Sequence, residues 1–79
     1  MREATRQEVM DCLDVTLAEE TTDLDERELF DLVDEAVYLK PKEWGWETVV
    51  IVFKESSPAI FVFTKEAGQW RYSREVYQA

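Results

Sequence analysis

Carboxylates are the only chemically active side chains that this sequence supplies in large number. Of its 79 residues, 18 are Asp or Glu, nine are Lys or Arg, and none is His. The lack of histidine removes the ordinary general base near neutral pH and the commonest metal ligand. Two glycines, Gly45 and Gly68, are too few for a phosphate-binding loop or a dinucleotide fingerprint. The sequence therefore excludes most enzyme classes, and we expect no catalytic residue and no cofactor.

Metal binding and thiol chemistry are also disfavoured. The spacing of Asp23 and Asp25 matches the start of a calcium-binding loop, but the glycine required at the sixth position is Glu28. A single cysteine without histidine cannot form an ordinary zinc site. Cys12 sits among apolar residues in a helical pattern, so we expect a buried and unreactive thiol. No metal site is expected.

The acidic residues are concentrated in one half of the chain. Residues 1–39 hold 13 acidic and three basic residues, a net charge of −10, whereas residues 40–79 hold five acidic and six basic residues, a net charge of +1. Carboxylates three or four residues apart on a helix have Cβ atoms about 5–6 Å apart, so stripes on two packed helices form an anionic array. Such an array can imitate a nucleic-acid backbone, although a solvated face that only aids solubility has the same composition. The candidate partner-binding residues are Glu8, Asp11, Asp14, Asp31, Asp34 and Glu35.

Two helices are expected in the acidic half. Val9, Met10, Leu13 and Leu17 recur at helical spacing, which predicts a helix over residues 3–19. A second apolar series predicts a helix over residues 24–39, which Pro41 ends. A capping box formed by Thr22 with Asp25, or by Asp23 with Glu26, would begin this second helix. Because the connection is short, we expect the two helices to form an antiparallel hairpin.

The second half changes to a strand pattern. Residues 47–54, 59–65 and 70–77 are rich in β-branched and aromatic side chains and are separated by short turns. The expected fold is therefore α+β, a single domain over residues 1–79. In it an N-terminal two-helix hairpin packs on a C-terminal three-stranded antiparallel sheet, in the order ααβββ.

Both faces of this sheet are expected to be apolar. The pattern places Val50, Val52, Phe61, Phe63, Trp70 and Tyr72 on one face, and Val49, Ile51, Phe53, Ile60 and Val62 on the other. Two helices cover only one face, so the other needs shelter from the linker tryptophans, from a second copy of the chain or from a partner. A second interface would involve Trp44, Trp46, Trp70 and Tyr72.

Direct nucleic-acid binding is a weaker hypothesis. The third strand interleaves Trp70 and Tyr72 with Arg71 and Arg74, which are the ingredients of a stacking surface for single-stranded nucleic acid. A net charge of −9 repels phosphate at long range, so we favour core aromatics with outward arginines.

These observations favour a non-enzymatic inhibitor or adaptor whose acidic face docks on a basic surface of a partner protein. The alternative is a structural interaction module, such as a homodimer, that assembles through an apolar sheet face. In size and charge alone the chain is similar to small acidic phage-type inhibitors, such as DNA-mimicking anti-restriction and anti-CRISPR proteins, and to some toxin-immunity proteins. The similarity carries over no residues. Because the sequence shows neither a membrane span nor a secretory signal, the expected location is the cytoplasm.

Overall fold

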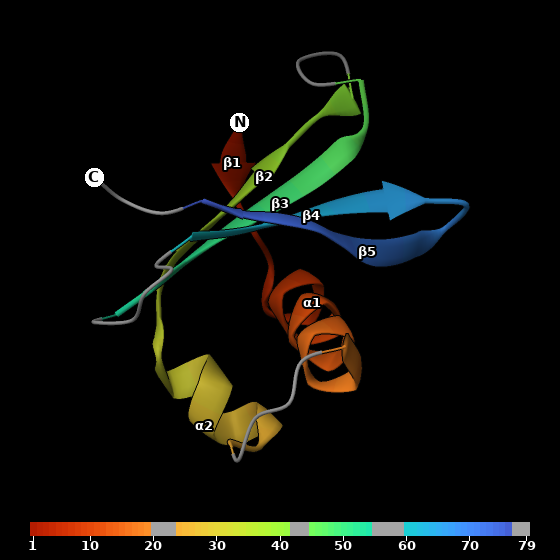
Figure 1. Ribbon diagram of the computed structural model, residues 1–79. Coiled ribbons are helices and arrows are strands. Elements are labelled where there is room, and N and C mark those ends of the chain that lie inside the picture. The colour runs from red at the N-terminus through yellow and green to blue at the C-terminus, as the bar shows by residue number, and fades with distance from the viewer. Residues whose placement is uncertain (20–23, 42–44, 55–59, 77–79) are drawn as a thin grey trace.

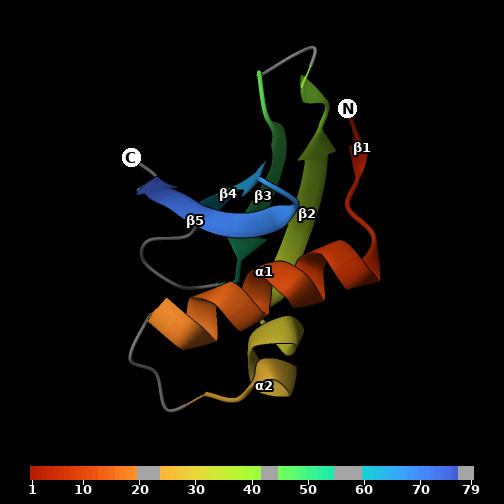
Figure 2. The ribbon, with the colours of Figure 1, turned by 90° about the vertical axis from the view of Figure 1, so that its right-hand side faces the viewer.

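The protein folds as a five-stranded antiparallel sheet with two helices on one of its faces (Figures 1 and 2). This computed structural model describes residues 1–19, 24–41, 45–54 and 60–76. In chain order the elements are β1 (Arg2–Glu3), α1 (Arg6–Glu19), α2 (Glu26–Asp31), β2 (Val33–Leu39), β3 (Glu47–Phe53), β4 (Ile60–Glu66) and β5 (Gln69–Val76). Their order across the sheet is β1-β2-β3-β4-β5.

The expected ααβββ fold is wrong, because half of the expected second helix is a strand. The helix predicted over residues 24–39 ends with the six-residue α2, and the chain continues as β2. Leu32 caps α2, and its carbonyl accepts a hydrogen bond from the Lys54 N–H at 2.8 Å. Beyond this point the backbone pairs with β3 on one side and β1 on the other, which a helix could not do. A short helix gains little from its own hydrogen bonds, so strand pairing wins over the apolar spacing.

The first helix begins later than expected. We predicted a helix over residues 3–19, but Arg2 and Glu3 form β1, and α1 starts at Arg6. A capping box sets this start: Thr5 Oγ1 accepts from the Glu8 N–H at 3.1 Å, and Glu8 Oε1 accepts from the Thr5 N–H at 2.8 Å.

The capping box of α2 also differs from the expected ones. It joins Asp25 to Glu28, through the Glu28 N–H and Asp25 Oδ1 at 2.8 Å and the Asp25 N–H and Glu28 Oε1 at 3.2 Å. Thr22 and Asp23, which we had expected to cap this helix, lie outside the described residues.

Arg2 ties the two-residue strand β1 to the rest of the molecule. β1 pairs with β2 at only two positions, Arg2 with Tyr38 and Glu3 with Val37. The Arg2 guanidinium lies 4.0 Å from the centre of the Tyr38 ring and forms an ion pair with Glu8 at 2.8 Å. β1, β2 and the first turn of α1 are therefore held by one side chain.

The three C-terminal strands lie within one residue of their expected ranges, but the assignment of side chains to faces is wrong. Val49 pairs with Phe63 and Ile51 pairs with Phe61, so these four side chains share a face. We had grouped Phe61 and Phe63 with Val50 and Val52 instead. A shift of one residue moves a whole strand pattern to the opposite face.

The aromatic residues gather on the face that the helices cover. Phe61 packs edge-on against Phe53 and Tyr72, and Phe63 packs edge-on against Tyr72, with ring centres 5.2, 5.5 and 5.8 Å apart. Putting the largest side chains under α1 buries the most apolar area, which favours this register.

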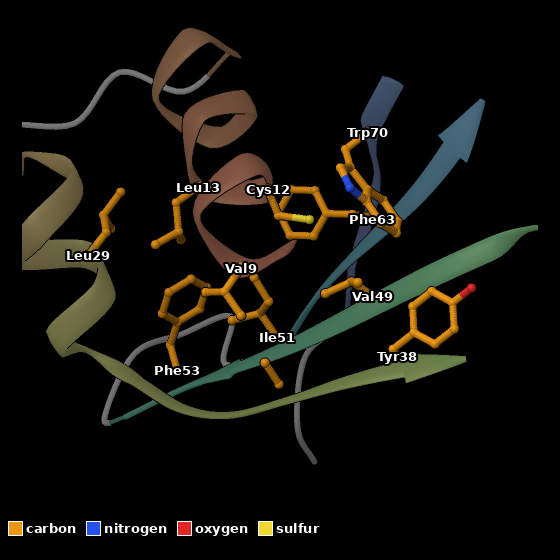
Figure 3. Close-up of a cluster of buried hydrophobic side chains, with 11 residues drawn as sticks. Val9, Cys12, Leu13, Leu29, Tyr38, Val49, Ile51, Phe53, Phe63 and Trp70 are labelled. Carbon is orange, nitrogen blue, oxygen red and sulfur yellow. The ribbon is translucent and has the colours of Figure 1, made fainter. Parts of the chain in front are cut away.

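The core lies between α1 and the sheet (Figure 3). Cys12 and Leu13 of α1 meet Val49, Ile51 and Phe63, and all five side chains are fully buried. Leu29 is the contribution of α2, and it lies beside Leu13 (Figure 3).

β5 is an edge strand with a bulge. It pairs with β4, and the register shifts between Val62 and Phe63, which face Arg74 and Tyr72. Ser73 is the extra residue at this shift.

Neighbouring positions of β3 test which face is covered. Ile51 is fully buried against α1, whereas Val52 lies on the opposite face. We expect Ile51→Ala to lower the free energy of unfolding by about 2–5 kcal/mol, because it leaves a cavity in the core. Val52→Ala should cost less than half as much in urea titrations at dilute protein concentration. Equal losses would contradict this register.

Candidate functional site

Four carboxylates form one surface where α1 and α2 meet, which we call the helical acidic surface. Its members are Asp11, Asp14 and Glu26, whose charges act on one another, and Asp31, which lines a hollow together with Glu26. Glu26 and Asp14 are close enough for a carboxyl–carboxyl hydrogen bond, which raises the pKa of Glu26. Burial and the negative charges of Asp14, Asp11 and Asp25 raise this pKa further. The two helices therefore hold like charges together.

A hollow between the helices carries the rest of this surface. It is lined by Arg6, Met10, Glu26, Arg27, Phe30 and Asp31. The Arg6 guanidinium lies 4.9 Å from the centre of the Phe30 ring. The pKa of Glu26 remains raised although Arg6 and Arg27 line the same hollow. These two arginines thus leave the negative charge incompletely compensated.

Glu8, another expected partner-binding residue, is engaged within the molecule. Both of its carboxylate oxygens accept hydrogen bonds from Arg2, at 2.8 and 2.9 Å. The Arg2 hydrogen bond is the main reason why the pKa of Glu8 lies below its usual value, and the Thr5 N–H contributes further. Glu8 therefore stabilises the start of α1 rather than presenting an uncompensated charge.

Asp34 and Glu35 lie on β2 and not on a helix. Asp34 is at the register shift between Val33 and Glu35, and Glu35 pairs with Val52. The structure thus divides the six expected acids among α1, α2 and β2. Glu26 was missed by the sequence analysis. The spacing of Asp25 and Glu28 as a capping box could have placed Glu26 in the first turn of α2, beside α1.

The opposite face of the sheet is the second candidate surface, which we call the open sheet face. Within the described residues no helix or strand lies over it (Figures 1 and 2). It holds a hollow of about 350 Å³ lined by Leu39, Trp46, Thr48, Val50, Ile60, Val62, Thr64, Ser73 and Arg74. Trp46 is 55% exposed, so it stands at this hollow without covering the face.

The aromatic and basic residues of β5 lie on opposite faces of the sheet. Trp70 is buried, with Lys65 5.6 Å from its ring, and Tyr72 packs against Phe61 and Phe63. Arg71 pairs with Thr64 and Arg74 with Val62, which places both arginines on the open sheet face. A mixed stacking surface therefore does not form on β5. Trp44, the remaining residue of the expected second interface, lies outside the described residues.

Metal ligation, membrane crossing and thiol chemistry each have a structural observation in the part of the chain that the structure describes. This part contains no three His, Cys, Asp or Glu side chains placed so that they could hold a metal ion together, and none of its helices has the length and apolar character needed to cross a membrane. Cys12 is fully buried, and this burial, aided by the charges of Asp11 and Glu8, raises the pKa of its thiol. A thiol in this state is a poor nucleophile.

The capping box at Thr5 predicts a measurable effect on stability. Thr5→Ala removes the acceptor for the Glu8 N–H, and we expect the free energy of unfolding to fall by about 1 kcal/mol. Thr5→Ser keeps the hydroxyl and should retain most of this free energy. Chemical denaturation of both variants checks the role, and an equal loss in both would contradict it.

The crowded carboxylates predict a pH dependence of stability. The folded-state pKa of Glu26 lies above its usual value of 4.5, so between these two values the folded protein binds more protons than the unfolded chain. Stability contributed by this proton is present at low pH and is lost as pH rises through the window. Glu26→Gln should therefore lose less stability than the wild type between pH 4.5 and neutral pH. Asp34→Asn, which removes an acid on β2 that is not among the groups raising the pKa of Glu26, should change this slope less. Thermal unfolding across this pH range measures both, and an unchanged slope in Glu26→Gln would contradict the contact.

The two surfaces differ in chemistry: one is a mainly acidic surface on the helices that also holds Arg6 and Arg27, the other an apolar sheet face with arginines along β5. Comparison with protein-family models, curated proteins and solved structures finds no match for this chain.

Proposed function

We propose that this chain is a small non-enzymatic binding protein whose helical acidic surface docks on a basic surface of a partner protein. The observation that carries the proposal is the packing of α1 beside α2, which brings Glu26 next to Asp14 in the half of the chain that holds the excess negative charge. Folding alone gains nothing from holding like charges together. A cationic surface would relieve this repulsion, so binding would recover free energy that the isolated protein lacks.

A nucleic-acid-binding protein is the partner class that best fits such a surface. Its binding site is basic and accepts a row of negative charges, which the carboxylates of α1 and α2 can imitate. Opposite charge would also accelerate the encounter through electrostatic steering. In this role the chain would act as an inhibitor or adaptor, in the manner of DNA-mimicking anti-defence proteins, and it would act in the cytoplasm.

Solubility alone is the competing explanation of the acidic charge. It requires only net charge, so it predicts no difference between acids on the helices and acids elsewhere. Docking through the helical acidic surface predicts that position matters. The chain offers a matched pair of variants that separates the two explanations.

Reversing two central acids should disrupt binding. We expect Asp14→Lys with Glu26→Lys to weaken binding to the partner at least tenfold at low salt, because attraction turns into repulsion. The control, Asp34→Lys with Glu35→Lys, makes the same change in net charge on β2 and should weaken it much less. Proteins captured from the native host by the wild type are identified, and their affinities for the three proteins are then compared. Equal affinities, or equal losses, would contradict docking through this surface.

Mimicry adds a competition test. Duplex DNA and this chain should exclude each other from the captured partner, and binding should weaken as salt rises because screening acts on the charged contact. A ternary complex of partner, DNA and this chain would rule out mimicry while leaving the acidic contact itself intact.

A further inference from the structure

The open sheet face has a row of five side chains that runs across all five strands. Glu3 pairs with Val37, Val37 with Val50, Val50 with Val62, and Val62 with Arg74. Directly opposed residues of an antiparallel sheet point to the same face. The row therefore reads, from β1 to β5, as an acid, three valines and an arginine.

Each flanking row carries a charge at one end. On one side Glu35 pairs with Val52, which pairs with Ile60. On the other side Leu39, Thr48 and Thr64 lead to Arg71. Glu3 and Glu35 thus lie on the β1–β2 side of the open sheet face, the arginines lie on the β5 side, and the middle is largely apolar. Glu66, at the end of β4, also lies on this face and accepts a hydrogen bond from Thr64 at 3.0 Å.

These terminal charges are available for an external contact. Glu3, Glu35, Arg71 and Arg74 are all exposed. Among the described residues the ion pair that the structure records joins Arg2 to Glu8, on the helix-covered side, and includes none of these four. By contrast, the valines between them are only partly exposed.

A two-fold axis parallel to the strands makes this pattern complementary to itself. Such an axis, passing through Val50, turns the β5 side of one copy over the β1 side of the other. Arg74 then faces Glu3 of the second copy, Val62 faces Val37, and Val50 faces its own counterpart. A two-fold axis that lies in the plane of the sheet but runs perpendicular to the strands would instead place arginines opposite arginines and acids opposite acids. The charge pattern therefore selects one of the two face-to-face arrangements.

We propose that the open sheet face is a homodimer interface in which two copies pack sheet to sheet about an axis parallel to their strands, with Arg74 of each copy paired to Glu3 of the other. Aligned sheets pack about 10 Å apart, which lets the apolar middles interlock. Side chains of the second copy fill the hollow beside Trp46. The helical layers point outward on opposite sides, so the strongly negative halves stay apart.

This interface is independent of the proposed docking of the helical acidic surface. Self-association is measured with the purified chain alone, so a failed dimer leaves the partner hypothesis standing, and a missing partner leaves the dimer standing. If both the dimer and the partner proposal are correct, the dimer presents two helical acidic surfaces.

Charge exchange tests the pairing directly. The purified wild type should sediment as a dimer at micromolar concentration. Arg74→Glu and Glu3→Arg should each raise the dimer dissociation constant roughly tenfold or more, because each places two like-charged pairs in the interface. An equimolar mixture of these two variants should associate as tightly as the wild type, since both cross-interface pairs then have opposite signs.

Two further variants complete the experiment. Val50→Arg puts like charges against each other on the axis and should yield monomers. Lys65→Glu, the same charge change as Arg74→Glu but on the helix-covered face of β4, should leave the dimer unchanged. Circular dichroism of each variant verifies that the monomer keeps its fold. A monomeric wild type would overturn the proposal. A dimer that tolerates Val50→Arg, or a mixture that shows no recovery, would overturn it as well.

Discussion

The packing of α1 against a single face of the sheet is the contact on which the rest of the structure depends. Cys12 and Leu13 fit against Val49, Ile51 and Phe63, and these side chains have no exposure to solvent. A chain of 79 residues can form only one such core. Once the aromatic side chains are placed beneath α1, the alternation of the strands leaves smaller apolar side chains, mainly Val and Ile, on the other face.

Two surfaces of opposite character follow from this single core. The polar side of the helices carries carboxylates, some held closer together than their charges favour, whereas the far face of the sheet ends in arginines on β5. Since the sheet and its core lie between them, a molecule bound to one surface would leave the other accessible. This separation also explains why a net charge of −9 does not describe either surface well.

Local composition was sufficient to locate the C-terminal strands but not β2. Residues 47–54, 59–65 and 70–77 are dense in β-branched and aromatic side chains, and no helical spacing competes there. In residues 33–39 the apolar positions fit both periods, and the decisive fact is the long-range pairing with β1 and β3. Long-range packing also decides which residues share the candidate site. Asp11, Asp14 and Asp31 lie on helices, as their spacing predicted, while Glu26 comes beside Asp14 only through the packing of α2 against α1. Asp34 and Glu35 were misplaced because the helix was extended too far.

The register error has a related cause. Two strands with apolar residues at almost every position give no polar side chain to mark the solvent side, so the sequence pattern alone is ambiguous by one residue. The aromatic residues resolve it, because Phe53, Phe61, Phe63 and Tyr72 form one connected set of edge-to-face contacts. That set can only form when all four rings share a face.

The bulge in β5 has a consequence for how the protein behaves at high concentration. A long, flat edge strand offers a row of backbone donors and acceptors to any neighbouring chain and so promotes aggregation into extended sheets. In β5 the extra residue Ser73, opposite the step from Val62 to Phe63 of β4, interrupts this row of backbone groups. Arg71 and Arg74 place positive charge next to it. Another copy that approached edge to edge would meet a kinked backbone and like charges. The protein can therefore keep an apolar sheet face for specific contacts while its exposed strand edge resists fibril growth.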